Sequence, residues 1–411
     1  MHQKDSDRFS GKELRGRSHG QAYARLCVAL LVFLAFALGC SEFVVIGILT
    51  EISDFFGVSL AEAGRLTSLF ALTYAIFTPV LALATGRFKR FYVLCVYLVL
   101  FAAGNVLSVV APTFEVLLAA RILLGSISGA LLAVGVTFIP ELVGQERTSS
   151  ALTLVYSAYS VALILATSAG KLMASRVGWH ATLVAALIIT LVTVVAVALV
   201  LPRESKTDEP TRAKDQLKLF TEPSILTGAL VFVFGIGSIY TFYGYVTPYL
   251  EQVVGLDTIA ISEVLLVYGF ITFFSNLLSG WISTRFGLRA LVVTFIMQAV
   301  VFLGLYMVGT WRQGVLALMM VIALLMYLAS IPSVSSFMEI AQARHPGALT
   351  LASSLEPLSF NVGISFGTAV GGYAVMGPGI QAIGLIAAIL ALIAAGWVVL
   401  TVHLKSRAHL T

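Results

Sequence analysis

The stretch at residues 179–201 reads WHATLVAALIITLVTVVAVALVL and contains no Asp, Glu, Lys or Arg. A transmembrane helix needs about 20 apolar residues, because each residue adds about 1.5 Å along a helix that must cross about 30 Å of hydrocarbon. This stretch meets that requirement. Its side chains are apolar all round the helix instead of on one face, as lipid demands. The stretch therefore predicts a membrane-spanning helix.

Other stretches of the chain meet the same requirement, and we expect twelve spans in all. They lie at about 25–50, 61–86, 91–110, 114–140, 149–175, 179–201, 224–250, 260–284, 288–309, 314–338, 349–375 and 380–403. The predicted organisation has five parts: a tail at 1–24, a six-helix bundle at 25–201, a linker at 202–223, a second bundle at 224–403 and a tail at 404–411.

The composition of the whole chain agrees with a membrane protein. Of its 411 residues 59% are hydrophobic and only 11% are charged, whereas soluble domains carry about 25% charged residues. The net charge of +5 does not indicate nucleic-acid binding, because the basic residues lie in short loops. Cys27, Cys40 and Cys95 all lie in apolar runs, so we expect no disulfide framework and no metal site. The chain has no P-loop for ATP, and we expect no cofactor and no enzyme activity.

The positions of Lys and Arg predict the orientation in the membrane. With the N-terminus in the cytoplasm, the inner segments hold 20 of the 25 basic residues and the outer ends hold three, Arg65, Arg176 and Arg312. Basic residues are retained on the cytoplasmic side. We therefore expect the spans to be surrounded by the lipid bilayer and both termini to lie in the cytoplasm.

The two predicted bundles repeat one template. An offset of 198 relates Arg87 to Arg285 and Gly57 to Gly255, and an offset of 197 relates Gly170-Lys171 to Gly367-Thr368. Parallel six-helix repeats are typical of transporters with a central cavity and alternating access. The predicted fold class is thus an all-α polytopic membrane protein with two pseudo-symmetric six-helix bundles.

Several short motifs carry a resemblance to a known family. They are Arg-Phe-x-x-Arg after span two and its counterpart after span eight, Ser41-Glu42-Phe43-Val44 with Gly47-Ile48-Leu49, Ala120-Arg121-x-x-x-Gly125, Gly170 with Gly178-Trp179, and Phe360-Asn361-x-Gly363. With twelve spans, this set resembles the major facilitator superfamily. Within it, the set is similar to the bacterial drug/proton antiporters, closest to the arabinose-efflux and sugar-efflux branch. This resemblance implies a monomer in the inner membrane of a bacterium. The resemblance assigns Arg87, Arg90, Arg285 and Arg289 to gate loops.

The chain departs from the family pattern at positions close to the expected cavity. Gly86 and Thr284 stand where the loop motif usually has an Asp that pairs across the gate. Ser128 in span four stands where related efflux proteins often have a His, which makes it a candidate substrate contact. These differences mean that the substrates of the branch do not transfer to this chain.

Glu42 and Arg121 are the first pair of intramembrane charges. Both lie about eight residues from the outer ends of their spans, which places them about 12 Å below the outer boundary. We expect the pair to face the cavity of the N-terminal bundle and to interact. One interpretation is a proton switch, in which Glu42 takes a proton and releases Arg121. The other is a static buried pair that fixes helix packing. All six His residues lie in loops or at span ends, so a carboxylate must carry the proton.

Glu356 and Lys171 are the other intramembrane charges, and each has two interpretations. Glu356 in span eleven is a second protonation site or a ligand for a cationic group, or it accepts a hydrogen bond at a helix kinked by Pro357. Lys171 in span five projects into the outer cavity near Glu42 and Arg121, or its ammonium extends to the interface. If Lys171 joins the other two, the outer cavity is positive and suits acidic or zwitterionic solutes.

The predicted function follows from the resemblance together with these charges. We expect a secondary transporter that exports a small polar or amphipathic solute in exchange for protons. Tyr240, Tyr243 and Asn361 are further candidate substrate contacts. Three alternatives remain open: export of a metal-chelating metabolite, siderophore or amino-acid derivative, import by proton symport, and a non-transporting receptor built on a transporter fold.

Overall fold

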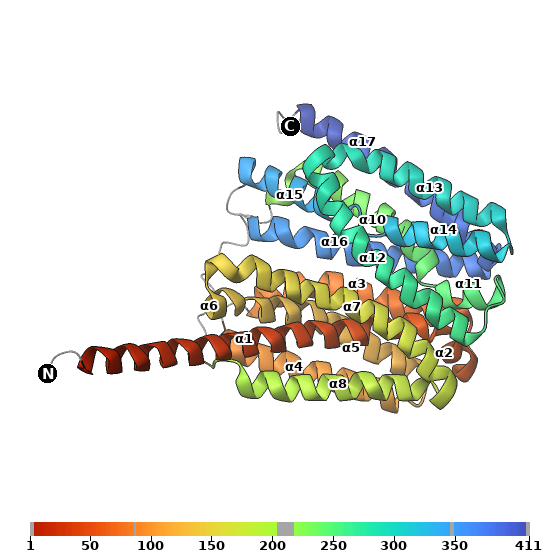
Figure 1. The fold of residues 1–411 in the computed structure, drawn as a ribbon. Helices are drawn as coiled ribbons and strands as arrows, with labels where there is room; N and C mark the ends of the chain where they lie inside the picture. The colour runs from red at the N-terminus through yellow and green to blue at the C-terminus, as the bar shows by residue number, and fades with distance from the viewer. Residues whose placement is uncertain (1–3, 86–87, 204–217, 346–348, 408–411) are drawn as a thin grey trace.

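The computed structural model describes residues 4–85, 88–203, 218–345 and 349–407, and every regular element in these ranges is a helix (Figure 1). The N-terminal half, which we call the N-half, comprises α1 (Lys4–Gly47), α2 (Leu49–Phe56), α3 (Leu60–Thr85), α4 (Arg90–Val110), α5 (Phe114–Val136), α6 (Ile139–Val143), α7 (Gln145–Val177) and α8 (Trp179–Val200). The C-half comprises η1 (Lys218–Thr221), α10 (Pro223–Tyr243), α11 (Val246–Gln252), α12 (Thr258–Phe286), η2 (Gly287–Arg289), α13 (Ala290–Val308), α14 (Arg312–Leu325), α15 (Ser330–Arg344), α16 (Leu349–Met376), η4 (Ile380–Ala382) and α17 (Ile383–Arg407).

The two halves lie side by side as two layers of nearly parallel long helices (Figure 1). The most extensive contacts between the halves are those of α3 with α16 and of α7 with α12. A glycine allows the close approach of α7 and α12, because a Cβ on Gly269 of α12 would lie 3.0 Å from the Ile164 Cα of α7. Gly372 of α16 packs on α3 at ordinary contact distance, since a Cβ there would lie 3.6 Å from the Ala61 Cα. The start of α1 and the end of α17 lie at one end of the molecule, which we call the terminal end; the opposite end is the far end (Figure 1).

The described residues contain ten segments that are long and apolar enough to cross a membrane. One of them, Thr258–Val308, is 51 residues long and includes both α12 and α13. Helix α16, with 28 residues, corresponds to predicted span eleven but is not among the ten. The polytopic character is therefore confirmed, while the number twelve stays a prediction.

Four of the predicted spans are each divided into two helices. Spans one and seven break near the far end, at Ile48 (φ −117°, ψ 23°) and Tyr245 (φ −123°, ψ 21°). Spans four and ten break before α6 and α15. The breaks fall in corresponding spans of the two halves, and the short α2 and α11 are followed by Gly57 and Gly255, with φ of +65° and +67°. This correspondence supports the predicted repeat, although hydropathy alone had indicated continuous helices.

The repeat offset of 197 in spans five and eleven is wrong by about one helical turn. A Cβ on Gly47 would lie 2.5 Å from the Thr167 carbonyl oxygen of α7, and one on Gly244 would lie 3.2 Å from the Thr368 side chain of α16. Thr167 and Thr368 are 201 residues apart, and so are Gly178 and Gly379, which both have a φ of +99°. A shift of four residues keeps nearly the same helix face, so the offsets of 197 and 201 place the matched residues on similar faces.

Candidate functional site

Glu42 lies at the boundary between the two halves. Its side chain is 6% exposed and lines a small cleft with residues from α3, α10 and α16. The cleft residues include Thr67, Phe70, Tyr240 and Ile364. The carboxyl group of Glu42 is therefore placed where a change in the packing of the halves would alter its surroundings.

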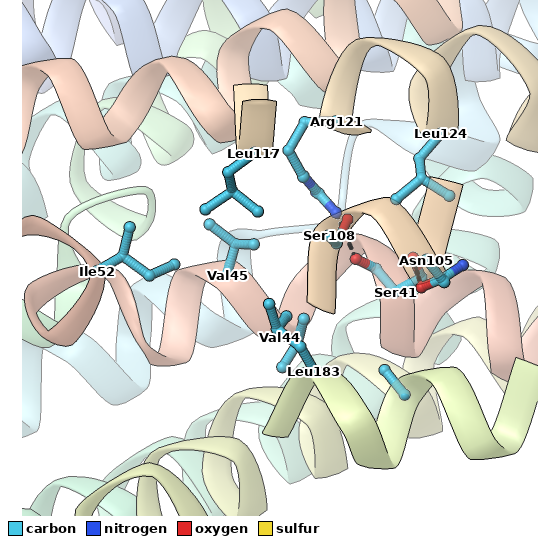
Figure 2. Close-up of a pocket in the computed structure, with 11 residues that line it drawn as sticks. Ser41, Val44, Val45, Ile52, Asn105, Ser108, Leu117, Arg121, Leu124 and Leu183 are labelled. Carbon is cyan, nitrogen blue, oxygen red and sulfur yellow. Dashed lines mark hydrogen bonds between the residues drawn. The ribbon is translucent and has the colours of Figure 1, made fainter. Parts of the chain in front are cut away.

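Arg121 contacts Glu42 through the main chain, and Figure 2 shows the neighbouring contact of Arg121 with Ser41. Its guanidinium donates to the carbonyl oxygens of Ser41 at 2.6 Å, Glu42 at 2.9 Å and Leu66 at 3.3 Å, and it lies 4.3 Å from the centroid of the Phe70 ring. No ion pair within the described residues joins Arg121 to the Glu42 carboxylate. The expected interaction between the two residues is present, but Arg121 uses its planar set of donors to hold α1, α3 and α5 together.

The Glu42 carboxyl group has a tyrosine as its polar neighbour. The Tyr159 side chain of α7 lies close to the carboxyl group, and its hydroxyl makes no hydrogen bond within the described residues. A buried charge without a hydrogen-bonded counter-ion is costly. A proton or a cationic group can remove that cost.

Glu356 is the second carboxylate at the boundary of the halves. It is half-buried on α16, and the Ser330 side chain lies within reach of it. Tyr74 of the N-half and Tyr327 of the C-half lie within electrostatic range of both Glu356 and Glu42. The two carboxylates therefore border one region that is rich in tyrosine.

Aromatic rings form a continuous series in the C-half beside these carboxylates. Tyr327 stacks on Phe360 with centroids 5.8 Å apart, and Phe360 lies 6.2 Å from Tyr240. Tyr240 lies 5.7 Å from Tyr243, which stacks on Tyr268 at 5.0 Å. The Tyr240 hydroxyl is buried and has no hydrogen-bond partner in the described part of the chain. The structure thus brings Tyr240 and Tyr243 together and leaves one of them with an unused polar group.

Asn361 and Ser128 differ in what they can offer a ligand. The Asn361 amide nitrogen donates to the Pro357 carbonyl at 3.0 Å, and its buried Oδ1 has no partner among the described residues. Ser128 is fully buried in α5 and donates to the Leu124 carbonyl at 2.7 Å. Asn361 therefore keeps a free acceptor, whereas the Ser128 side chain has no exposed surface with which to contact a solute.

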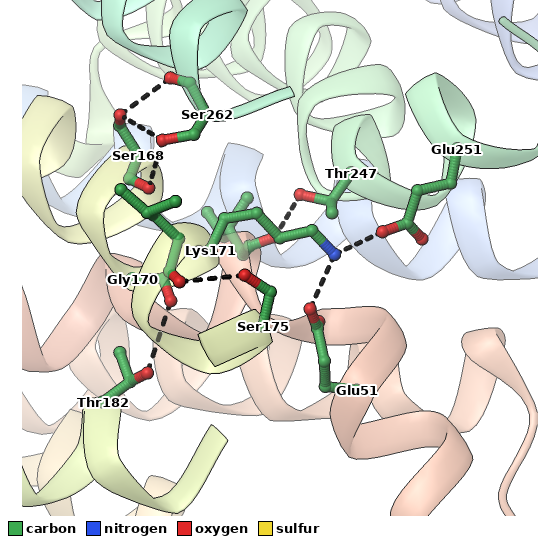
Figure 3. Close-up of polar contacts among 11 residues, drawn as sticks. Glu51, Ser168, Gly170, Lys171, Ser175, Thr182, Thr247, Glu251 and Ser262 are labelled. Atoms are coloured by element: carbon green, nitrogen blue, oxygen red, sulfur yellow. Dashed lines mark hydrogen bonds and ion pairs between the residues drawn. The ribbon is translucent and has the colours of Figure 1, made fainter. Parts of the chain in front are cut away.

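Lys171 lies in an ion cluster with Glu51 and Glu251 (Figure 3). This cluster is at the far end, and Arg121 is not part of it. Lys171 is only 2% exposed, and its Nζ donates to Glu51 of α2 at 2.6 Å and to Glu251 of α11. The ammonium does not extend to the interface, because these carboxylates satisfy it inside the protein. We call Lys171, Glu51 and Glu251 the Lys171 cluster.

Two further contacts close the far end beside this cluster. The Ser168 and Ser262 hydroxyls each donate to the other residue's carbonyl, at 2.7 and 2.8 Å. The Thr247 hydroxyl donates to the Ile46 carbonyl at 3.0 Å. The Ser168–Ser262 and Thr247–Ile46 hydrogen bonds both join the N-half to the C-half (Figure 3). The hydrogen bonds between the halves that the structure describes are thus concentrated at the far end.

The predicted gate arginines lie at the terminal end. Arg90 donates to Glu141 at 3.2 Å and to the Thr137 carbonyl at 3.3 Å. These bonds join the start of α4 to the end of α5 and to α6. Arg285 and Arg289 are exposed at the end of α12 and in η2. Arg87 lies outside the described residues. Within the described ranges, no group of three or more His, Cys, Asp or Glu residues is placed to hold a metal ion.

Comparison with known families decides the classification of this fold. The sequence model of the Major Facilitator Superfamily matches residues 31–355, which is more than half of the chain. The chain belongs to the Major Facilitator Superfamily. The predicted family is therefore confirmed. Membership of this family indicates that the protein is a transporter rather than an enzyme.

Curated relatives of this major facilitator protein are bacterial. It is 27% identical over 339 residues to the uncharacterized MFS-type transporter YtbD of Bacillus subtilis, with 82% of this chain and 85% of YtbD covered. It is 26% identical to the inner membrane transport protein YdhP of Escherichia coli K12, with 82% and 86% covered.

Solved structures of transporters share the fold. A bacterial homolog of the human lysosomal transporter Spinster, in an inward-facing and occupied conformation, has a TM-score of 0.76 at 16% identity, with 93% of this chain and 97% of that chain covered. A D-xylose–proton symporter has a TM-score of 0.70 at 17% identity, with 92% and 97% covered. At these identities the likeness establishes the fold alone.

Sequence reasoning missed several residues of this major facilitator site. Tyr74, Tyr159 and Tyr327 border the carboxylates, but nothing distinguishes them from other intramembrane tyrosines in the sequence. Glu51 and Glu251 were not among the candidate residues that the sequence indicated. Their charge next to an apolar span was a usable signal, because a carboxylate at that depth needs a cation.

Proposed function

We propose that this protein exports a small amphipathic solute with a protonated amine in exchange for protons, by alternating access. One observation carries the proposal: Glu42 and Glu356 border an aromatic-lined region between the halves, while the donors of Arg121 and Lys171 are engaged by protein groups. Proton antiport and the outward direction rest on the family resemblance.

The charge balance at the boundary favours an amine over an acid. An acidic solute needs donors that are free to bind it. The guanidinium of Arg121 already binds three carbonyl oxygens, and Lys171 lies between two carboxylates. The groups at the boundary that no opposite charge of the protein binds are carboxylates and aromatic faces, which both attract cations. The sequence favoured an acidic or zwitterionic solute only if Lys171 lay at the same depth as Glu42 and Arg121. Lys171 lies instead in the cluster at the far end.

Glu42 and Glu356 would serve both the proton and the solute in this proposal. Each carboxyl group can hold either a proton or the amine, so binding of one displaces the other. Tyr240, Tyr243 and Asn361 would contact the body of the solute. In the proposed orientation the terminal end faces the bacterial cytoplasm, and the closed far end, with the Lys171 cluster, prevents release until the halves rearrange.

Inside-out vesicles test this function. The vesicles are energised to an acid lumen, and a panel of amphipathic amines is added beside carboxylic acids of similar size, with a pH-sensitive dye as the readout. Amines should release lumenal protons through the wild type, and Glu42→Gln and Glu356→Gln should each reduce this release at least about tenfold. Glu115→Gln, which changes an exposed carboxylate at the start of α5, is the matched control and should behave as wild type.

Two results would contradict the proposal. If carboxylic acids release protons and amines do not, the assigned solute class is wrong. If amines added outside right-side-out vesicles alkalinise the medium, the protein is an importer by symport.

A further inference from the structure

A cavity of about 510 Å³ lies at the terminal end of the C-half, apart from the boundary between the halves. It is an open cavity bordered by the end of α12, by η2, and by parts of α15 and α17. Its polar lining consists of Ser283, Thr284, Arg289, Ser335, Ser336, Glu339 and Lys405. Nothing in the proposed transport cycle uses this cavity.

The charges of the cavity favour an anion. Arg289 is exposed and makes no ion pair with a residue that the structure describes. Lys405 is buried to more than nine-tenths, and its Nζ donates to Ser336 at 3.1 Å and to Glu339 at 2.8 Å. Two cations against one carboxylate leave one positive charge. Arg289 supplies planar donors that suit a phosphate group, and the fixed Lys405 adds a second cation.

Hydroxyl groups complete the polar side of the cavity. Ser283 of α12 and Ser335 of α15 lie 3.4 Å apart, and Ser336 is held by Lys405. Hydroxyls can donate to phosphate oxygens from several directions, because their hydrogens rotate. The cavity thus presents hydroxyls from two helices beside a free guanidinium.

An apolar rim distinguishes the cavity from a site for a soluble anion. Phe286 lines it and is 58% exposed, and Trp281, which is 52% exposed, lies 5.7 Å from Phe286. Leu288, Pro332 and Val402 also line the cavity. Exposed aromatic residues at the end of a spanning helix are typical of the membrane–water interface. A ligand that contacts both sides of this lining needs an anionic head and an apolar body.

We propose that this cavity binds the phosphodiester headgroup of an anionic glycerophospholipid. Arg289 and the hydroxyls contact the phosphate, and the buried Lys405 adds electrostatic attraction. The acyl chains lie against Phe286 and Trp281. Basic pockets between spanning helices bind such headgroups in other membrane proteins. The bound lipid joins the ends of α12, α15 and α17 and stabilises this end of the C-half.

Lipid titration of the purified full-length protein, followed by native mass spectrometry, tests the proposal. Wild type should bind phosphatidylglycerol more tightly than zwitterionic phosphatidylcholine. Arg289→Ala should weaken phosphatidylglycerol binding roughly fivefold, the contribution of one basic residue. Ser335→Leu, which fills the cavity without a change in charge, should weaken it as well. Arg285→Ala removes an exposed arginine four residues away that does not line the cavity, and it should have no effect.

Each opposite result overturns the assignment. Equal losses in Arg285→Ala and Arg289→Ala would show diffuse attraction to a basic surface. Equal binding of the two lipids would show an unspecific apolar contact. Displacement of phosphatidylglycerol by an excess of inorganic phosphate would identify a soluble anion as the ligand.

Discussion

Arg121 and Lys171 are both almost completely buried, but their charges are balanced in different ways. Arg121 donates to three carbonyl oxygens, which carry only partial negative charge. Lys171 lies between two full carboxylates, Glu51 and Glu251. Arg121 therefore still attracts the Glu42 carboxylate without binding it, and this arrangement separates the structural contribution of Arg121 from the chemistry of Glu42.

Stability measurements distinguish these two contributions. Arg121→Lys should lower the free energy of unfolding by about 3 kcal/mol, because a lysine cannot reach three carbonyls and charge-assisted hydrogen bonds contribute about 1.5–3 kcal/mol each. Glu42→Gln should change it by less than about 1 kcal/mol, since no hydrogen bond joins its carboxylate to Arg121. Thermal unfolding in detergent measures both variants. An equal loss in Glu42→Gln would make the pair a static one.

At the scale of single residues, the intramembrane charges could be identified from the sequence more readily than their partners. The cost of an intramembrane charge is local information, so Glu42, Arg121, Lys171 and Glu356 were evident. The partners of Lys171 were not, because Glu51 and Glu251 lie 120 and 80 residues away in the chain. Only the tertiary fold brings these groups together.

Helix boundaries were predictable wherever lipid sets the length. The predicted span at 179–201 corresponds to α8 (Trp179–Val200), and the span at 349–375 to α16 (Leu349–Met376). The breaks at Ile48 and Tyr245 were not predictable from hydropathy, because both residues are apolar and only their backbone dihedrals change. These breaks matter for the site, since they form α2 and α11, the helices that carry Glu51 and Glu251.

The Lys171 cluster gives a prediction about the elements that it joins. Lys171→Met removes the ammonium that links α7 to α2 and α11, so the far end should open more often. In a background without Cys27, Cys40 and Cys95, a cysteine in place of the buried Thr247 reports this opening by its reaction with a thiol reagent. We expect reaction to be at least about tenfold faster in Lys171→Met, a change of about 1.4 kcal/mol.

Arg176→Met is the matched control for this measurement, because Arg176 is exposed near the end of the same helix. The control should react at the wild-type rate. An unchanged rate in Lys171→Met would mean that the apolar contacts alone keep the far end closed.

At the scale of the whole molecule, the duplication and the two-layer fold were visible in the sequence because motifs recur at nearly one offset. The state of the molecule was not visible, since it depends on contacts between the halves. The reciprocal Ser168–Ser262 hydrogen bonds join α7 to α12 at the far end and provide a way to test whether the halves must separate there.

A disulfide between these positions should stop transport. The two hydroxyl oxygens are 3.1 Å apart, so Ser168→Cys with Ser262→Cys brings two sulfurs close together in the same cysteine-free background. Oxidation should abolish proton release in the vesicle assay, and a reductant should restore it. Either single variant is the control. Full activity with the disulfide formed would show that the far end need not open between α7 and α12.

The one-turn shift between spans five and eleven makes the two sides of the molecule chemically unequal. With an offset of 201, the counterpart of Lys171 is Gly372, which packs against Ala61 of α3 and the Tyr245 hydroxyl. At the far end, α7 is therefore joined to its neighbours by ion pairs, whereas α16 is joined to α3 at this position by uncharged contacts. Lys171 is only 2% exposed, and salt screens such a buried ion pair much less than an exposed one. The duplication therefore left unequal partners at the far end, an ammonium between two carboxylates in one half and a glycine against an alanine in the other, so a substitution at one position is no model for its counterpart.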